Sequence, residues 1–225
     1  MPSPTVENYL KHIYLEQERT PQGWVLMGRL AQVMGVVPGT ATSMVKSLAD
    51  AGLVVYQPRG GVSLSPGGEQ LALRVIRRHR LVELFLVRVL KMDWSEVHEE
   101  AEQLEHAISD KVLACMDQAL GRPEFDPHGD PIPPHEGKPN DAALIPLSEC
   151  HANKPVCIAR LADQEPEFLR YVESQGLIPQ AWVTVQQVHP QAQSIEVRIK
   201  RGPQITLGLS AAAKVLVLAP DQHAD

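Results

Sequence analysis

The sequence contains few cysteines and no long apolar segment. Of its 225 residues only Cys115, Cys150 and Cys157 are cysteine, an odd number that lacks the paired spacing of a zinc finger. We therefore expect idle or buried thiols rather than a disulfide framework. No run approaches the roughly 18 apolar residues that a membrane helix requires, and the first residues lack the features of a secretory signal. These absences predict a cytoplasmic protein without a membrane partner.

The chain also lacks an overall positive charge, which argues at first against binding to DNA. Its formal net charge is −6, but the charge is unevenly distributed. Residues 1–91 contain 11 Lys and Arg against 6 Asp and Glu, whereas residues 92–225 contain 10 against 21. A basic first part suits contact with phosphates, and an acidic remainder suits contact with cations.

Apolar residues recur at helical spacing in the first fifty residues. Positions 6, 9, 10, 13 and 14 predict a first helix, with Thr5 as its cap. A second helix is expected over 27–34, and a third from Pro38, a first-turn residue, to the stop at Gly52. Two β segments, 53–57 and 62–65, are joined by a Gly-rich turn. The pattern predicts a winged helix-turn-helix domain over residues 1–65.

The rest of the chain divides into a helical and a β-rich part. Long helices are expected over 66–90 and from about residue 93 or 95 to 120. Residues 121–142 contain six prolines and three glycines, so they mark a boundary. One helix is expected near 166–175, among short β runs near 156–160, 182–187, 194–199, 205–209 and 214–218. We predict a mainly α fold, with a helical dimerisation and metal-binding domain plus its Pro-rich connector over 66–142, and a small β-barrel domain over 143–225.

The third helix is the predicted DNA-reading element. A helix-turn-helix places its second helix in the major groove, where small or polar side chains reach the base edges. The residues that fit are Pro38, Gly39, Thr40, Thr42, Ser43 and Lys46 on the helix, and Arg59 at the tip of the wing. The basic cluster at 77–80 is a further candidate for phosphate contacts, although Lys and Arg on helices are most often only solvated.

Histidines and carboxylates recur one helical turn apart in two segments. His79 and Glu83 are four residues apart, so they share a helix face. In the next segment His98, Glu102 and His106 follow at intervals of four, with Glu105 beside them. Between residues 93 and 110 there are seven acidic residues and no Lys or Arg. By spacing alone, this stretch fits a cation site and a solvated acidic face equally well.

Four segments resemble, in order and spacing, those of the diphtheria toxin repressor family of metal-dependent regulators. They are RRHRLVE at 77–83, VHEEAE at 97–102, EHAISD at 105–110 and DPHGDPIP at 126–133. The resemblance extends over essentially the whole chain. It implies a homodimer in which a divalent metal orders the first helix and sets the recognition helices for a palindromic DNA operator, so that metal-uptake genes are repressed. It also implies that the third domain is the small barrel of the longer family members.

The same resemblance implies two metal sites. The primary site would use Asn8, Glu102, Glu105 and His106, and the ancillary site His79, Glu83 and His98, with further ligands at Gln164 and Glu167. Iron-sensing members would have Met at position 8 and Cys at position 102. Glu102 instead matches manganese-sensing members, which have Asp at position 8 and Glu where this chain has Lys11. Oxygen and nitrogen ligands suit Mn(II), which we favour, while Fe(II), which binds such sites somewhat more strongly, is the alternative.

Two other functions remain open. A winged-helix regulator with an organic effector, or with none, would leave the acidic stretch as mere surface. A metallohydrolase would use the same carboxylates and histidines around a water-bearing metal. The sequence offers no separate nucleophile and no phosphate-cradling Gly-rich loop, and a hydrolase would leave the basic recognition helix unexplained. We therefore expect a regulator and not an enzyme.

Overall fold

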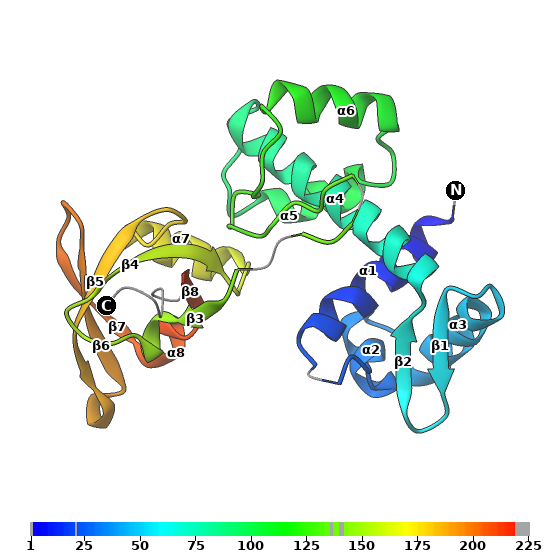
Figure 1. Ribbon diagram of the computed structural model, residues 1–225, viewed down its shortest axis with the longest axis horizontal. Helices are drawn as coiled ribbons and strands as arrows, with labels where there is room; N and C mark the ends of the chain where they lie inside the picture. Colours follow the sequence, from blue (N-terminus) through cyan, green and yellow to red (C-terminus); the bar gives the residue numbers. More distant parts are fainter. Residues whose placement is uncertain (1, 21, 136, 140–141, 219–225) are drawn as a thin grey trace. The chain divides into compact units, whose positions relative to one another are not determined.

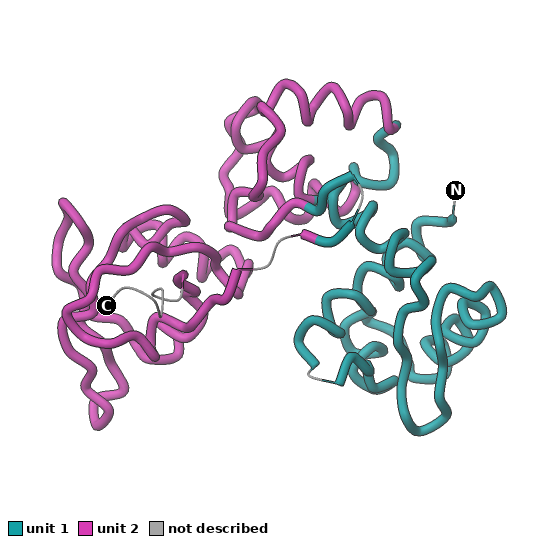
Figure 2. Tube along the Cα trace, in the orientation of Figure 1, with its two compact units in different colours: residues 1–79, 104–109, 133–138 teal, residues 80–103, 110–132, 139–225 magenta. Residues whose placement is uncertain are grey.

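A computed structural model describes residues 2–20, 22–135, 137–139 and 142–218. The chain forms two compact units, which Figure 2 shows in different colours. Unit 1 comprises residues 1–79, 104–109 and 133–138, and unit 2 comprises residues 80–103, 110–132 and 139–225. Within the described part of the chain, no helix has both the length and the apolar character needed to cross a membrane.

Unit 1 contains the predicted helix-turn-helix and wing (Figure 1). Its elements are α1 (Pro4–Glu18), α2 (Met27–Val33), α3 (Pro38–Asp50), β1 (Val54–Gln57), β2 (Gly61–Leu64) and the first part of α4 (Pro66–Arg88). Leu10, Ile13, Leu30, Val45 and Val62 are buried in one shared core. The predicted cap of α1 is wrong. Its N-cap is residue 3 rather than residue 5, because proline occupies the first helical position that follows.

The wing is a short antiparallel hairpin attached to the loop before α2. Gln57 is paired with Gly61, which leaves three residues for the turn. Val25 and Val62 exchange two backbone hydrogen bonds of 2.9 Å, which attach the wing to the loop before α2. Gly61 adopts φ +111°, and a Cβ there would lie 2.5 Å from the carbonyl oxygen of Val25. Only glycine allows this close approach.

The helices after α4 differ from the prediction. Instead of one helix to about residue 120, there are two, α5 (Val97–Leu104) and α6 (Asp110–Ala119), with a break at 105–109. Glu105 and His106 lie in this break, where they bond to side chains almost a hundred residues away in sequence. These hydrogen bonds between distant segments interrupt the helix, although the apolar residues continue at helical spacing. Ser109 and Asp110, both of residue types that favour helix starts, begin a new helix.

The second part of unit 2 is an antiparallel six-stranded sheet with strand order β3-β8-β4-β5-β6-β7. Its strands are β3 (Leu144–Pro146), β4 (Pro155–Leu161), β5 (Trp182–His189), β6 (Ser194–Ile199), β7 (Gln204–Gly208) and β8 (Val215–Leu218). The helices α7 (Pro166–Ser174) and α8 (Leu209–Ala212) contribute buried residues to its core. The five predicted β runs correspond to β4–β8, and the short β3 was not predicted.

The connector between the helices and the sheet is held by its own turn and by β4. Both backbone amides at 128 and 130 donate to Asp126 Oδ1 at 2.8 Å. The amide of Leu161 donates to the carbonyl of His128 at 3.0 Å. Gly129 has φ +88°, and a Cβ there would lie 2.0 Å from the carbonyl oxygen of Ala159. Residues 136, 140 and 141 of the predicted connector lie outside the described residues.

Candidate functional site

The recognition helix α3 has one buried and one exposed face. Ala41, Val45 and Leu48 are buried in the core of unit 1. Five of the six predicted DNA-reading residues on α3 are exposed, namely Pro38, Gly39, Thr40, Ser43 and Lys46. Thr42 is half-buried, and its hydroxyl donates to the carbonyl of residue 38 at 2.8 Å.

Two further residues extend this exposed surface. Arg59 lies between β1 and β2 at φ +68° and is exposed, so it stands at the wing tip as expected. Val37, directly before α3, is 68% exposed. The sequence reasoning missed Val37, although an apolar side chain beside the start of a recognition helix is suited to contact a thymine methyl group.

The arginines at 77–80, which are candidates for phosphate contacts by sequence, contact the protein itself. Arg77 donates to the carbonyl of Pro133 at 2.7 Å. Arg78 is buried and lies 3.6 Å from a carboxylate oxygen of Glu7. Arg80 donates to the carbonyl of Pro131 at 2.5 Å. These guanidinium groups bind parts of the protein itself, because α4 directs them inward rather than into solvent.

In unit 1, the segment after α5 meets α1 through His106. Its Nδ1 lies 2.6 Å from Glu7 Oε2, and its Nε2 lies 2.7 Å from Asn8 Oδ1. The same Nε2 is 3.2 Å from Glu105 Oε1. Three of the four residues predicted for the primary site, Asn8, Glu105 and His106, are thus brought together by the fold.

Glu105 is fully buried and is held between two basic side chains. Its Oε1 accepts a hydrogen bond from Lys11 Nζ at 2.7 Å, and its Oε2 lies 2.6 Å from His79 Nδ1. Lys11 is also buried, with 3% of its side chain exposed. A buried carboxylate requires such compensation, because removal from water strongly disfavours an isolated charge.

Glu102, the fourth predicted primary residue, is in α5. Its carboxylate oxygen Oε1 lies 3.9 Å from His98 Nε2, one helical turn back. Glu102 is therefore close to a residue of the predicted ancillary site, and its place in the primary site stays a prediction.

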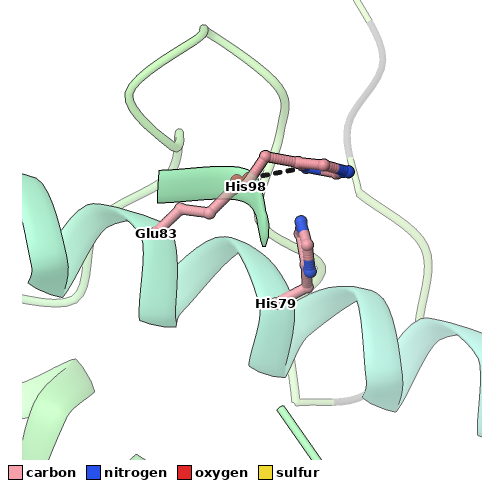
Figure 3. Close-up of side chains that lie close together, drawn as sticks. All are labelled: His79, Glu83 and His98. Atoms are coloured by element: carbon pink, nitrogen blue, oxygen red, sulfur yellow. Dashed lines mark hydrogen bonds and ion pairs between the residues drawn. The ribbon is translucent and has the colours of Figure 1, made fainter. Parts of the chain in front are cut away.

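The predicted ancillary residues come together on α4 and α5. Because α4 is one continuous helix, its geometry places His79 one turn from Glu83. Figure 3 shows these two side chains beside that of His98, whose Nδ1 is 3.1 Å from Glu83 Oε1. One ligand atom from each residue lies within 4.8 Å of the others. Glu83 and His79 are buried, whereas His98 is 47% exposed.

The other oxygen of Glu83 faces a second group that sequence reasoning missed. Glu83, Asp126 and His128 are all buried and present ligand atoms within 4.8 Å of one another. His128 Nε2 bonds to the carbonyl of Trp94 at 2.9 Å, which leaves the Nδ1 lone pair directed at the carboxylates. Neither His128 Nδ1 nor Asp126 Oδ2 has a hydrogen-bond partner among the described residues.

Burial of Asp126, and then the nearby carboxylates of Asp130 and Glu83, raises its pKa well above the ordinary value. Two carboxylates and a histidine lone pair that face one another repel, and the guanidinium of Arg80, 3.9 Å from Asp126 Oδ2, supplies part of the compensating charge. The sequence signal for this group is the DPHG turn at 126–129, where an acidic residue and a histidine are two residues apart.

The two residues predicted as ligands from the last domain lie near the connector or in solvent. The amide Nε2 of Gln164 donates to Asp130 Oδ2 at 2.8 Å. Glu167 is exposed in the first turn of α7. Their role as metal ligands stays a prediction.

Glu7 and Lys11 are the other residues that sequence reasoning did not assign. Both lie on the apolar stripe of α1, since Leu10 and Tyr14 follow Glu7 at three and seven residues. Charged residues within a buried stripe are uncommon and are normally paired. This pattern of charged residues within an apolar stripe is the sequence signal that could have identified them.

The chain combines a winged helix-turn-helix with histidines and carboxylates that cluster beside its first helix. This combination is typical of DNA-binding regulators that respond to metals. Residues 1–62 match the family described as iron dependent repressor, N-terminal DNA binding domain. Residues 65–134 match its metal binding and dimerisation domain, and residues 145–219 match the FeoA domain.

Individual proteins agree with these matches. The iron-dependent repressor IdeR of Mycobacterium tuberculosis is 33% identical over 197 residues, which cover 81% of this chain and 84% of IdeR. The diphtheria toxin repressor of Corynebacterium diphtheriae is 35% identical over 146 residues, 63% of each chain. A solved manganese-dependent transcriptional repressor in complex with manganese has a TM-score of 0.86 and 39% identity, and the match covers 96% of this chain and 100% of that one. The chain belongs to the iron-dependent repressor family of metal-dependent transcriptional regulators, which confirms the resemblance.

Proposed function

We propose that this protein is a homodimeric repressor that binds its DNA operator when Mn(II), or alternatively Fe(II), is held by Asn8, Glu102, Glu105 and His106. The observation that carries the proposal is the contact of His106 with α1. Its two ring nitrogens lie 2.6 and 2.7 Å from side-chain oxygens of Glu7 and Asn8. A ligand at this point bears directly on the first helix of the DNA-binding domain.

The donor set supports a divalent metal of this kind. Asn8 offers an amide oxygen, Glu102 and Glu105 offer carboxylate oxygens, and His106 offers a ring nitrogen. Oxygen and imidazole ligands without thiolates suit Mn(II) and Fe(II). The bond from His106 Nδ1 to the Glu7 carboxylate fixes the ring, as is usual for a histidine that binds metal through its other nitrogen.

We favour Mn(II), with Fe(II) as the alternative. Glu102 supplies a hard oxygen ligand, and a solved repressor whose match covers 96% of this chain is manganese-dependent. The family name and the IdeR relative point to iron. Because the two ions accept similar ligands, the choice rests on their relative effect on DNA binding.

The proposed mechanism is a shift between two populations. The bound metal supplies positive charge among the carboxylates, and this chain's own residues hold α1 against segment 104–109. If the metal-bound arrangement is also the one that fits DNA, metal tightens DNA binding and DNA tightens metal binding by the same factor. Such coupling is typically about 5- to 150-fold.

Exposed apolar residues support dimerisation in unit 2. Helix α6 has no buried residue, and Val112 on it is 49% exposed. Val89 and Leu90, just after α4, are 48% and 58% exposed. These exposed apolar side chains are candidates for the surface that a second copy covers, in keeping with the dimerisation domain of the family.

We also propose that Glu83 serves two neighbouring cation groups. One oxygen faces His98, and the other lies 4.0 Å from His128 Nδ1. Cation binding beside Asp126 and His128 would offset the repulsion in this buried group. The number of Mn(II) ions bound per chain should then fall in His128→Gln, while the control His189→Gln, in β5 of the sheet, keeps the full number.

The test is an anaerobic DNA-binding titration at fixed salt, with apo protein, Mn(II), Fe(II) and Zn(II) compared by fluorescence anisotropy. Wild type should bind an operator-like fragment from its own regulatory region about 5- to 150-fold more tightly with the cognate metal. The double variant Glu105→Gln, His106→Ala should lose this response, with its folding checked by circular dichroism, and His189→Gln should retain it. An undiminished metal response in the double variant would contradict the proposed site. No response to any metal in wild type would favour a regulator with an organic effector, or with none.

A further inference from the structure

We infer that Lys11 is a built-in cation that competes with the metal for Glu105 and so sets the metal concentration at which the protein responds. The inference rests on the proposed function, because it assigns a role at that metal site. It starts from one contact, the 2.7 Å bond between Lys11 Nζ and Glu105 Oε1.

The oxygen that Lys11 binds is the one that faces the other proposed ligands. His106 Nε2 is 3.2 Å from Glu105 Oε1, and it is 2.7 Å from Asn8 Oδ1. The opposite oxygen, Oε2, is directed at His79 instead. A metal held by Asn8, Glu105 and His106 and the ammonium of Lys11 would therefore require the same oxygen.

The metal ion and the ammonium group of Lys11 would repel each other if both were bound at Glu105 Oε1. The side chains of Lys11 and Glu105 are 3% and 0% exposed, so water screens their surroundings poorly. An ammonium beside a divalent ion repels it strongly under such conditions. Metal binding must therefore move the Lys11 side chain away, and the lost ion pair is subtracted from the metal affinity.

Lys11 also has an effect when metal is absent. Its bond joins α1 to segment 104–109, the same two parts that the metal would join. Without it, Glu105 would remain buried with less compensating charge. The lysine thus keeps the metal-free protein folded at this site.

The experiment compares Lys11→Met, Lys11→Gln and Lys11→Arg with wild type. Mn(II) affinity is measured by isothermal titration calorimetry, and the thermal midpoint of the apo protein is measured separately. In the two neutral variants Mn(II) should bind about tenfold more tightly, within the usual range of coupling between sites. Their apo midpoint should fall by roughly 5–10 °C, as expected when a buried pair loses one partner. Lys11→Arg should stay close to wild type in both measurements.

Lys154→Met, which removes an exposed positive charge on the β domain, is the matched control and should change neither quantity. Equal or weaker Mn(II) binding in both neutral variants, with wild type still metal-responsive, would overturn the inference. If Lys11→Met does not fold, Lys11→Gln keeps an amide that can still donate to Glu105 and decides the question. A wild type that binds no metal would instead contradict the proposed function, so the two failures are distinguishable.

Discussion

At the residue scale, Glu7 is the side chain that orients the proposed metal-binding histidine. It is 7% exposed, contacts His106 Nδ1 at 2.6 Å and has Arg78 at 3.6 Å on its other oxygen. Because the carboxylate can hold the proton on Nδ1, His106 can offer the lone pair of Nε2, which lies beside Asn8 and Glu105, to a bound metal. Glu7 contacts the histidine rather than the metal, so we assign it a positioning role.

Replacing this carboxylate should weaken metal binding without removing a ligand. Glu7→Gln is expected to lower the Mn(II) affinity about 10- to 100-fold, the usual effect of losing the partner of a metal-binding histidine. Calorimetric titration of the purified variant measures this directly. Glu18→Gln, an exposed position on the same helix, is the control. An unchanged dissociation constant in Glu7→Gln would show that His106 is oriented by other contacts.

At the scale of elements, the helix-turn-helix is held to α1 by an ion pair. Glu16 accepts two hydrogen bonds from Arg29, at 2.6 and 2.9 Å, and one from Arg19 at 3.1 Å. The hydrogen bonds from Arg29, together with its charge, hold the pKa of Glu16 below its ordinary value. Since the folded pKa is lowered, this pair stabilises the fold above the unfolded pKa and the stabilisation is lost as pH falls through the folded value.

Glu16→Gln should therefore lower the free energy of unfolding at pH 7 by about 1–2 kcal/mol, the contribution of hydrogen bonds to a charged group. The difference from wild type should shrink as the pH falls below about 4. Urea unfolding of both proteins at several pH values measures it, with Glu18→Gln as the control. A difference that is the same at pH 7 and at pH 3.5 would show that charge at Glu16 is not its cause.

The connector turn is the second element whose fit can be tested. Gly129 and Gly137 share φ +88°, but a Cβ at 129 meets a carbonyl oxygen at 2.0 Å, while a Cβ at 137 meets nothing within 4 Å. Both alanine variants place a side chain in the left-handed region, at about 1–2 kcal/mol. Only Gly129→Ala must also displace β4, so thermal unfolding should show it to be the less stable variant by at least about 2 kcal/mol. Equal midpoints would mean that the turn and β4 separate easily.

The helix break at 105–109 shows where prediction from periodicity ends. The acidic stretch has apolar and polar residues at helical spacing through residue 120, so one long helix was expected. Glu105 and His106 leave the helix because their partners, Lys11, Glu7 and Asn8, are on α1. Partners this distant in sequence cannot be inferred from the pattern of neighbouring residues. The DNA-binding helices were predicted closely because their caps, stops and apolar stripes are all local.

At the scale of the whole molecule, the uneven charge agrees with a division of roles. The basic first 91 residues contain α3 and the wing, whose exposed residues include Lys46 and Arg59. The acidic remainder contains most of the carboxylates and histidines of the cation groups. A negative net charge therefore does not conflict with DNA binding by one face.

DNA binding should depend on Lys46 in a manner that is independent of base sequence. Lys46→Ala is expected to weaken binding to all fragments alike and to reduce the slope of log affinity against log salt by about 1. Anisotropy titrations at several salt concentrations, in saturating metal, measure the slope. Lys111→Ala, at an exposed position in α6, should leave it unchanged. A loss confined to one DNA sequence would instead assign Lys46 to a base contact.

The residues along the chain were enough to predict the winged helix-turn-helix, the succession of α and β parts and the candidate ligands at positions 8, 79, 83, 98, 102, 105 and 106. Helical period, turn residues and ligand chemistry are properties of nearby residues, so they can be read along the chain. Only the tertiary structure decided that Glu7 meets His106, that Lys11 meets Glu105 and that Asp126 and His128 face Glu83. Each of these contacts joins segments that are distant in sequence. Its contribution to stability depends on how deeply the groups are buried, and burial cannot be predicted from residue spacing alone.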